Sequence, residues 1–99
     1  FQLAVINPGF IMGPNLNSCK FSSGDFMRQV LLGEIPFLPL MNVGMVDVRD
    51  VAQAHYEALV RPEAAGHRFL LVSTGCFMTE IGGFLKEKYS DSYPKIVDK

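Results

Sequence analysis

Residues 5–14, which read VINPGFIMGP, decide how the chain folds. An unbroken apolar run, residues 3–6, is interrupted there by Asn-Pro-Gly. Such a strand is apolar on both faces, which is typical of a central parallel strand that helices cover on both sides. Pro8 cannot donate a backbone hydrogen bond, so it marks the carboxyl end of the predicted strand. Gly9 then permits unusual dihedral angles or the close approach of another backbone.

The carboxyl end of this strand is also a candidate binding site. Ligands of open parallel sheets bind outside the carboxyl ends of the strands. The alternative interpretation is an ordinary exit from a strand into a loop.

A helix is expected after the polar loop that follows the first strand. Ser23 is a plausible N-cap of this helix, and Gly33 stands where a C-terminal cap belongs. Residues 35–42 contain two prolines, which bar a regular helix, and several large apolar side chains. We therefore expect a hydrophobic loop that packs over an apolar surface.

The second half of the chain repeats the alternation of strand and helix. Residues 43–48 form a short apolar run, and Asp47 is predicted to cap a helix that Pro62 ends. Residues 67–72 predict a further strand, and Thr79 is expected to cap the last helix. The remaining segment, from Ser90 to Lys99, is expected to run over the surface.

Strands that alternate with helices predict an α/β fold with parallel pairing and right-handed crossovers. Three strands make a narrow sheet, and a parallel sheet that is buried on both faces needs neighbours that these residues do not supply. We therefore expect residues 1–99 to form a single incomplete domain.

The amino-acid composition excludes some classes of binding partner. The chain is 48% apolar and 19% charged, as expected of a soluble globular protein. Its nine basic and ten acidic residues include no Lys/Arg cluster, so nucleic acid and anionic membranes are not expected partners. Cys19 and Cys76 lie far apart, which favours reduced thiols in the cytoplasm.

No complete catalytic set is found among these residues. GxGxxG, Walker, GxSxG and YxxxK patterns do not occur. Asp50 and His55 could face one another without an identified nucleophile, and Asp47, His55 and His67 are irregularly spaced for a metal site. Structural roles are favoured for both histidines, so we assign no catalytic and no metal-binding residue.

Four features resemble the extended short-chain dehydrogenase/reductase superfamily in their order and separation. They are NPGFIMGP, the helix between Ser23 and Gly33, VDVRDVAQAH, and the terminal strand and helix. The pattern is most similar to the branch of the dihydroflavonol, cinnamoyl-CoA and methylglyoxal reductases. This resemblance implies the C-terminal portion of a Rossmann-type doubly wound parallel sheet, plus most of the small substrate-binding lobe.

The resemblance implies NADP as the cofactor, with NAD as the alternative, and a small carbonyl substrate. In this family the NPxxxxGP backbone lines the nicotinamide, which implies that Pro8, Gly9 and Phe10 contact it. Ser23 would match the family's small polar residue near the pyrophosphate.

The resemblance also implies a function, because the parent enzymes reduce an aldehyde or a ketone to an alcohol by hydride transfer from NADPH. The family's glycine fingerprint and its Ser, Tyr and Lys catalytic set are expected to precede Phe1, so we expect these 99 residues alone to be inactive. A non-catalytic interaction module and part of a nucleotide-sugar epimerase or dehydratase are the alternatives. The oligomeric state is left open.

Overall fold

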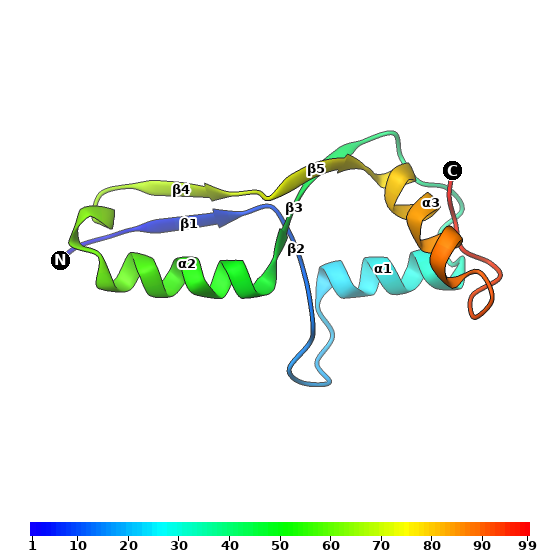
Figure 1. The fold of residues 1–99 in the computed structure, drawn as a ribbon, viewed down its shortest axis with the longest axis horizontal. Coiled ribbons are helices and arrows are strands. Elements are labelled where there is room, and N and C mark those ends of the chain that lie inside the picture. Colours follow the sequence, from blue (N-terminus) through cyan, green and yellow to red (C-terminus); the bar gives the residue numbers. More distant parts are fainter. The chain divides into compact units, whose positions relative to one another are not determined.

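The computed structural model describes all residues from Phe1 to Lys99 (Figure 1). The elements in chain order are β1 (Val5–Pro8), β2 (Phe10–Met12), α1 (Ser22–Leu32), β3 (Asn42–Asp47), α2 (Val48–Val60), η1 (Pro62–Ala64), β4 (Arg68–Leu71), β5 (Thr74–Phe77) and α3 (Met78–Tyr89).

The chain divides into two compact units. The first unit comprises Phe1–Leu16 and Gly44–Thr74, and the second comprises Asn17–Val43 and Gly75–Lys99. The expectation of a single incomplete domain stays a prediction.

The first unit is built on parallel strand pairs. β1 pairs with β4, so that Pro8 lies opposite Leu71, and β2 pairs with β3, so that Met12 lies opposite Asp47. Helix α2 runs alongside β1 and β4 (Figure 1). The predicted α/β fold with parallel pairing is confirmed.

Helix α2 begins after the predicted cap and ends two residues before Pro62. The Asp47 side chain accepts a hydrogen bond from the backbone N–H of Arg49, which satisfies one of the N–H groups at the helix start. The helix ends at Val60, and Pro62 opens the short helix η1.

The second unit contains α1 and α3 with an apolar core of its own. Gly33 follows α1 with φ 68°, the left-handed conformation of a C-terminal glycine cap, as predicted. Val30 is 0% exposed. The other buried apolar residues of this unit are Leu38, Met78, Ile81, Leu85 and Ile96.

The expectation of three strands is wrong. Five strands form two sheets, with the orders β1-β4 and β2-β3-β5. Strands β2 and β5 were missed because they are three and four residues long and adjoin Gly or Ser, so neither shows alternation over a useful window.

Two predicted caps are also wrong. Helix α1 begins one residue before Ser23, with Phe21 as its N-cap, because the N–H of Asp25 already donates to the carbonyl of Phe21. Thr79 lies inside the first turn of α3, whose N-cap is Phe77. There the N–H of Phe77 donates to the Glu80 carboxylate at 2.6 Å, an arrangement that needs no hydroxyl cap.

The expectation that residues 90–99 run over the surface is wrong at its far end. The N–H of Val97 donates to the carbonyl of Val30 at 3.2 Å, and the N–H of Leu38 donates to the Lys99 main-chain oxygen at 2.7 Å. Ile96 is 6% exposed. This segment is therefore part of the second unit's core.

Candidate functional site

A hollow opens at the carboxyl ends of the parallel strands of the first unit. Its volume is about 290 Å³, and it lies where β2 and β3 end and where the chain leaves β4. This is the position at which parallel α/β sheets bind their ligands. Its lining residues are Met12, Gly13, Met45, Val46, Asp47, Ser73 and Thr74.

Pro8, Gly9 and Phe10 form the junction between β1 and β2. Pro8 is the last residue of β1, and the N–H of Gly9 continues the ladder by donating to the carbonyl of Leu71 at 3.0 Å. A Cβ at Gly9 would overlap the carbonyl oxygen of Gly44. The predicted close approach of another backbone is thus confirmed, and the approaching backbone belongs to β3.

Asp47 supplies the hollow with a carboxylate that stays ionised. Arg49 donates from Nε to Oδ1 at 2.9 Å and from Nη2 to Oδ2 at 2.6 Å. These bonds, followed by the bond from the Arg49 backbone N–H, lower the pKa of Asp47 to about 2. The same pairing raises the pKa of Arg49. Asp47 is therefore ionised near neutral pH and is a poor proton donor, and the hollow offers a binding surface whose negative charge is balanced by Arg49.

Sequence reasoning placed Asp47 at the helix start but did not assign the other residues that line the hollow. Met12 and Met45 lie on β2 and β3, and Ser73 follows β4. The signal in the sequence was the position of Met12 at the end of a strand and of Ser73 just beyond one. It could not be used for Met12, because strand β2 was not predicted.

Ser23 belongs to the second unit, in the first turn of α1. It is 8% exposed and does not act as the N-cap. No side chain caps this helix.

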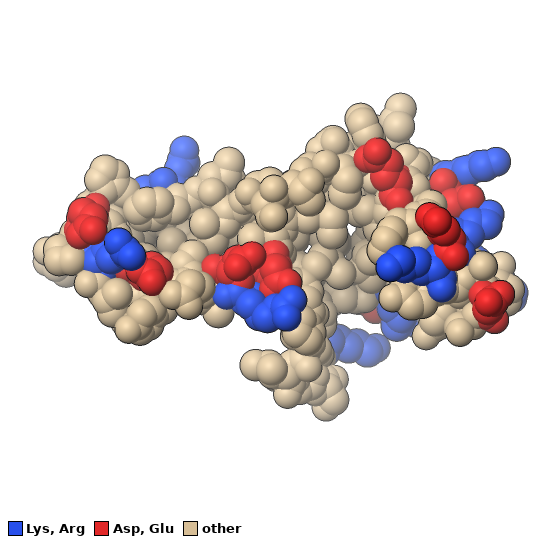
Figure 2. All heavy atoms as spheres, in the orientation of Figure 1, with Lys and Arg blue, Asp and Glu red and all other residues tan.

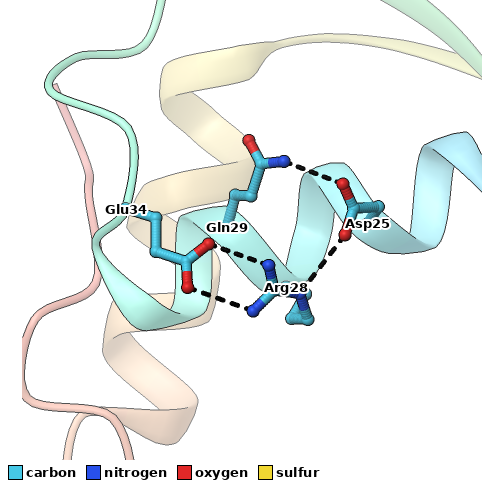
Figure 3. A network of polar contacts seen from close by, with 4 residues as sticks. All are labelled: Asp25, Arg28, Gln29 and Glu34. Carbon is cyan, nitrogen blue, oxygen red and sulfur yellow. Dashed lines mark hydrogen bonds and ion pairs between the residues drawn. The ribbon is translucent and has the colours of Figure 1, made fainter.

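A polar network lies further along α1 (Figure 3). Arg28 donates to Asp25 at 3.2 Å and to both carboxylate oxygens of Glu34, at 3.1 and 2.9 Å. Gln29 donates to the second oxygen of Asp25 at 2.8 Å. The bonds from Arg28, and then from Gln29, lower the pKa of Asp25. The network ties the turn at Gly33 to the body of the helix and leaves no unpaired carboxylate for chemistry.

His55 is hydrogen-bonded within its own helix. Nδ1 of His55 lies 2.8 Å from the carbonyl oxygen of Val51, one turn earlier on α2. No cluster of three His, Cys, Asp or Glu side chains could hold a metal ion. Cys19 and Cys76 form no disulfide bond.

Charges of both signs are interspersed on the surface. On the face shown in Figure 2, Lys and Arg side chains lie beside Asp and Glu side chains. Arg61, for example, is paired with Glu57, and Lys86 with Asp98. None of the helices has both the length and the apolar character needed to span a lipid bilayer.

Comparison with known proteins identifies reductases. No protein-family model matches the chain. It is 36% identical to cinnamoyl-CoA reductase 1 of Oryza sativa subsp. japonica over 88 residues, which are 89% of this chain and 26% of that relative.

Solved structures give the same result. Gre2 from Candida albicans matches with a TM-score of 0.79 and 29% identity, over 100% of this chain and 31% of that one. The yeast methylglyoxal/isovaleraldehyde reductase Gre2, complexed with NADPH, matches with a TM-score of 0.81 and 25% identity, over 99% of this chain and 30% of that one. The chain spans less than a third of the length of these relatives.

The parallel α/β architecture, the order of the motifs and these similarities agree over essentially the whole chain. The chain belongs to the extended short-chain dehydrogenase/reductase superfamily, among the relatives of the cinnamoyl-CoA and methylglyoxal reductases.

Proposed function

We propose that this chain is part of an NADP(H)-dependent oxidoreductase that reduces an aldehyde or a ketone to the alcohol by hydride transfer. The observation that carries the proposal is the match of 99% of the chain to a reductase solved with NADPH, at a TM-score of 0.81. The relative from rice, named a cinnamoyl-CoA reductase, supports the same class of reaction.

The first unit fits the nicotinamide end of the cofactor. Pro8, Gly9 and Phe10 lie at the carboxyl end of a parallel strand, and residues 8–13 carry no charged side chain. An uncharged, backbone-rich surface suits a flat heterocycle better than a phosphate. We propose that these three residues bind and orient the nicotinamide. NADPH, when bound, supplies the hydride.

The start of α1 fits the pyrophosphate. Backbone N–H groups at the start of a helix favour bound anions, and no side chain caps α1. We propose that Ser23, in the first turn, helps to hold the pyrophosphate there.

The hollow supplies binding surface for the carbonyl substrate. Met12 and Met45 provide adaptable apolar contacts, and Ser73 and Thr74 provide hydroxyl groups. Because Asp47 is ionised, we do not assign it as the donor of the proton that completes the alcohol.

The test uses the protein expressed from its own gene and follows NADPH oxidation with a panel of aldehydes and ketones, with NADH in parallel. We expect Phe10→Ala to raise the KM for NADPH about tenfold, the equivalent of one lost contact of 1.4 kcal/mol. Phe37→Ala is the matched control, because Phe37 is an exposed phenylalanine outside the proposed site.

The outcomes separate the candidate functions. Equal effects of Phe10→Ala and Phe37→Ala would exclude the assigned nicotinamide contact. A protein that binds no nicotinamide cofactor would instead be an interaction module. One that retains NAD and isomerises or dehydrates a nucleotide sugar would be an epimerase or a dehydratase.

A further inference from the structure

Residues 95–99, which we call the strap, join separate parts of the second unit. The N–H of Val97 donates to the carbonyl of Val30 on α1. The N–H of Leu38, in the loop before β3, donates to the Lys99 main-chain oxygen. One short segment is therefore hydrogen-bonded to both α1 and this loop.

Helix α3 also holds the strap. Nζ of Lys86 lies 2.9 Å from Oδ2 of Asp98, an ion pair that lowers the pKa of that carboxyl group. Ile96, which directly precedes Val97 in the strap, is as buried as Leu85 on α3. The strap thus has a polar attachment and an apolar anchor.

A glycine on α3 clears the space in which the strap lies. A Cβ at Gly82 would overlap the carbonyl oxygen of Val97 and would lie 2.6 Å from Cδ1 of Leu38 and 2.9 Å from Cα of Asp98. Real Cβ atoms do not approach other atoms so closely, so a side chain here would push the strap away. A Cβ at Gly83, the next residue, would meet nothing within 4 Å.

A second glycine, at the end of α1, also leaves space for the strap. A Cβ at Gly33 would overlap the carbonyl oxygen of Lys95, in addition to being strained at φ 68°. Both helices therefore approach the strap at a residue without a side chain.

We propose that the strap is a positioning device that fixes α1, and through it the helix start at Ser23, for binding of the cofactor. This inference rests on the proposed function, because it requires that the start of α1 meet the pyrophosphate. Because α1 is one continuous helix of 11 residues, a constraint at Val30 and Gly33 also limits movement of its first turn.

The test compares Gly82→Ala with Gly83→Ala in the protein expressed from its own gene. Hydrogen exchange of the α1 amides reports whether the strap constrains the helix, and the KM for NADPH and kcat report on function. We expect Gly82→Ala to raise both the exchange rate in α1 and the KM for NADPH about tenfold, with kcat nearly unchanged. Gly83→Ala is expected to leave all three unchanged.

A milder variant keeps the test decisive if Gly82→Ala fails to fold. Ile96→Val removes one methyl group from the buried anchor and is expected to change exchange and KM in the same direction by a smaller factor.

Three results would overturn the proposal. One is equal α1 exchange in the Gly82→Ala and Gly83→Ala proteins. Another is faster exchange with an unchanged KM for NADPH, which would make the strap structural only. The third is a wild-type protein that neither binds nor oxidises NADPH, which would overturn the proposed function together with this inference. In the first two results the wild-type protein is active, so only the role of the strap is overturned.

Discussion

At the scale of single residues, the Asp47 carboxylate accepts three hydrogen bonds from one residue, Arg49. It caps α2 through the backbone N–H of Arg49 and forms two further bonds with the Arg49 guanidinium. The Arg49 side chain is 72% exposed, so the pair is accessible to solvent and to salt. Only the ionised form of Asp47 accepts all three bonds.

The pH dependence follows from the lowered pKa of Asp47. Its folded-state pKa of about 2 lies below the ordinary value of 3.8, so its contribution to stability is fully present above pH 3.8 and is lost as the pH falls through about 2. We expect the NMR signals of the Asp47 carboxyl carbon and the Arg49 amide to titrate together, with a midpoint near pH 2. In Arg49→Ala the midpoint of the Asp47 carboxyl should rise towards 3.8, whereas an unchanged midpoint would contradict the role given to the guanidinium.

At the scale of elements, α1 packs through one buried apolar side chain and makes its polar contacts at the surface. On α1 the apolar anchor is Val30, and the polar network around Arg28 is half exposed. Exposed ion pairs contribute little to stability, even where several share one arginine. Burial should therefore dominate the stability of this helix.

Substitutions within α1 test this balance. Val30→Ala is expected to lower the free energy of unfolding by about 2 kcal/mol, because the site is fully enclosed and a cavity would remain. Leu32→Ala, on the same helix but 41% exposed, is the matched control and should cost well under half as much. The free energies of unfolding of both variants are measured by urea denaturation, with the denaturant slope unchanged between them. A similar loss of stability in the two variants would show that Val30 is not the anchor.

At the scale of the whole molecule, one face of the β1-β4 sheet exposes a large apolar side chain. Phe69 and Leu71 line a cavity with Ala54 and Ala58 of α2, so Leu70, between them on β4, points to the opposite face. Leu70 is 77% exposed. Parallel sheets are normally covered on both faces, so this face is expected to attract apolar surfaces.

This exposed face makes a prediction for the isolated 99-residue chain. We expect it to bind a hydrophobic dye and to associate with itself, and Leu70→Ser should reduce both. Leu59→Ser, at an exposed leucine on α2, is the control and should have less effect on dye binding. The dispersion of NMR chemical shifts must show that each variant is folded. A wild-type chain that stays monomeric and binds no dye would contradict the prediction.

The amino-acid sequence by itself determined the features that rest on local chemistry. Pro8 ends β1, Asp47 caps α2 and Gly33 ends α1, because in each case the residue type satisfies or interrupts backbone bonding within a few positions. The alternation of strand and helix likewise predicted the parallel α/β fold, and the order of the motifs predicted the superfamily.

Only the tertiary structure decided the features that join residues far apart in the chain. The contact between Gly82 and the strap was not predicted, and Ile96 was expected to lie in a surface segment. Strand β2 became recognisable only through its pairing with β3, more than 30 residues later. Such contacts leave no local period or cap in the sequence, because the partner that requires the residue lies in another element.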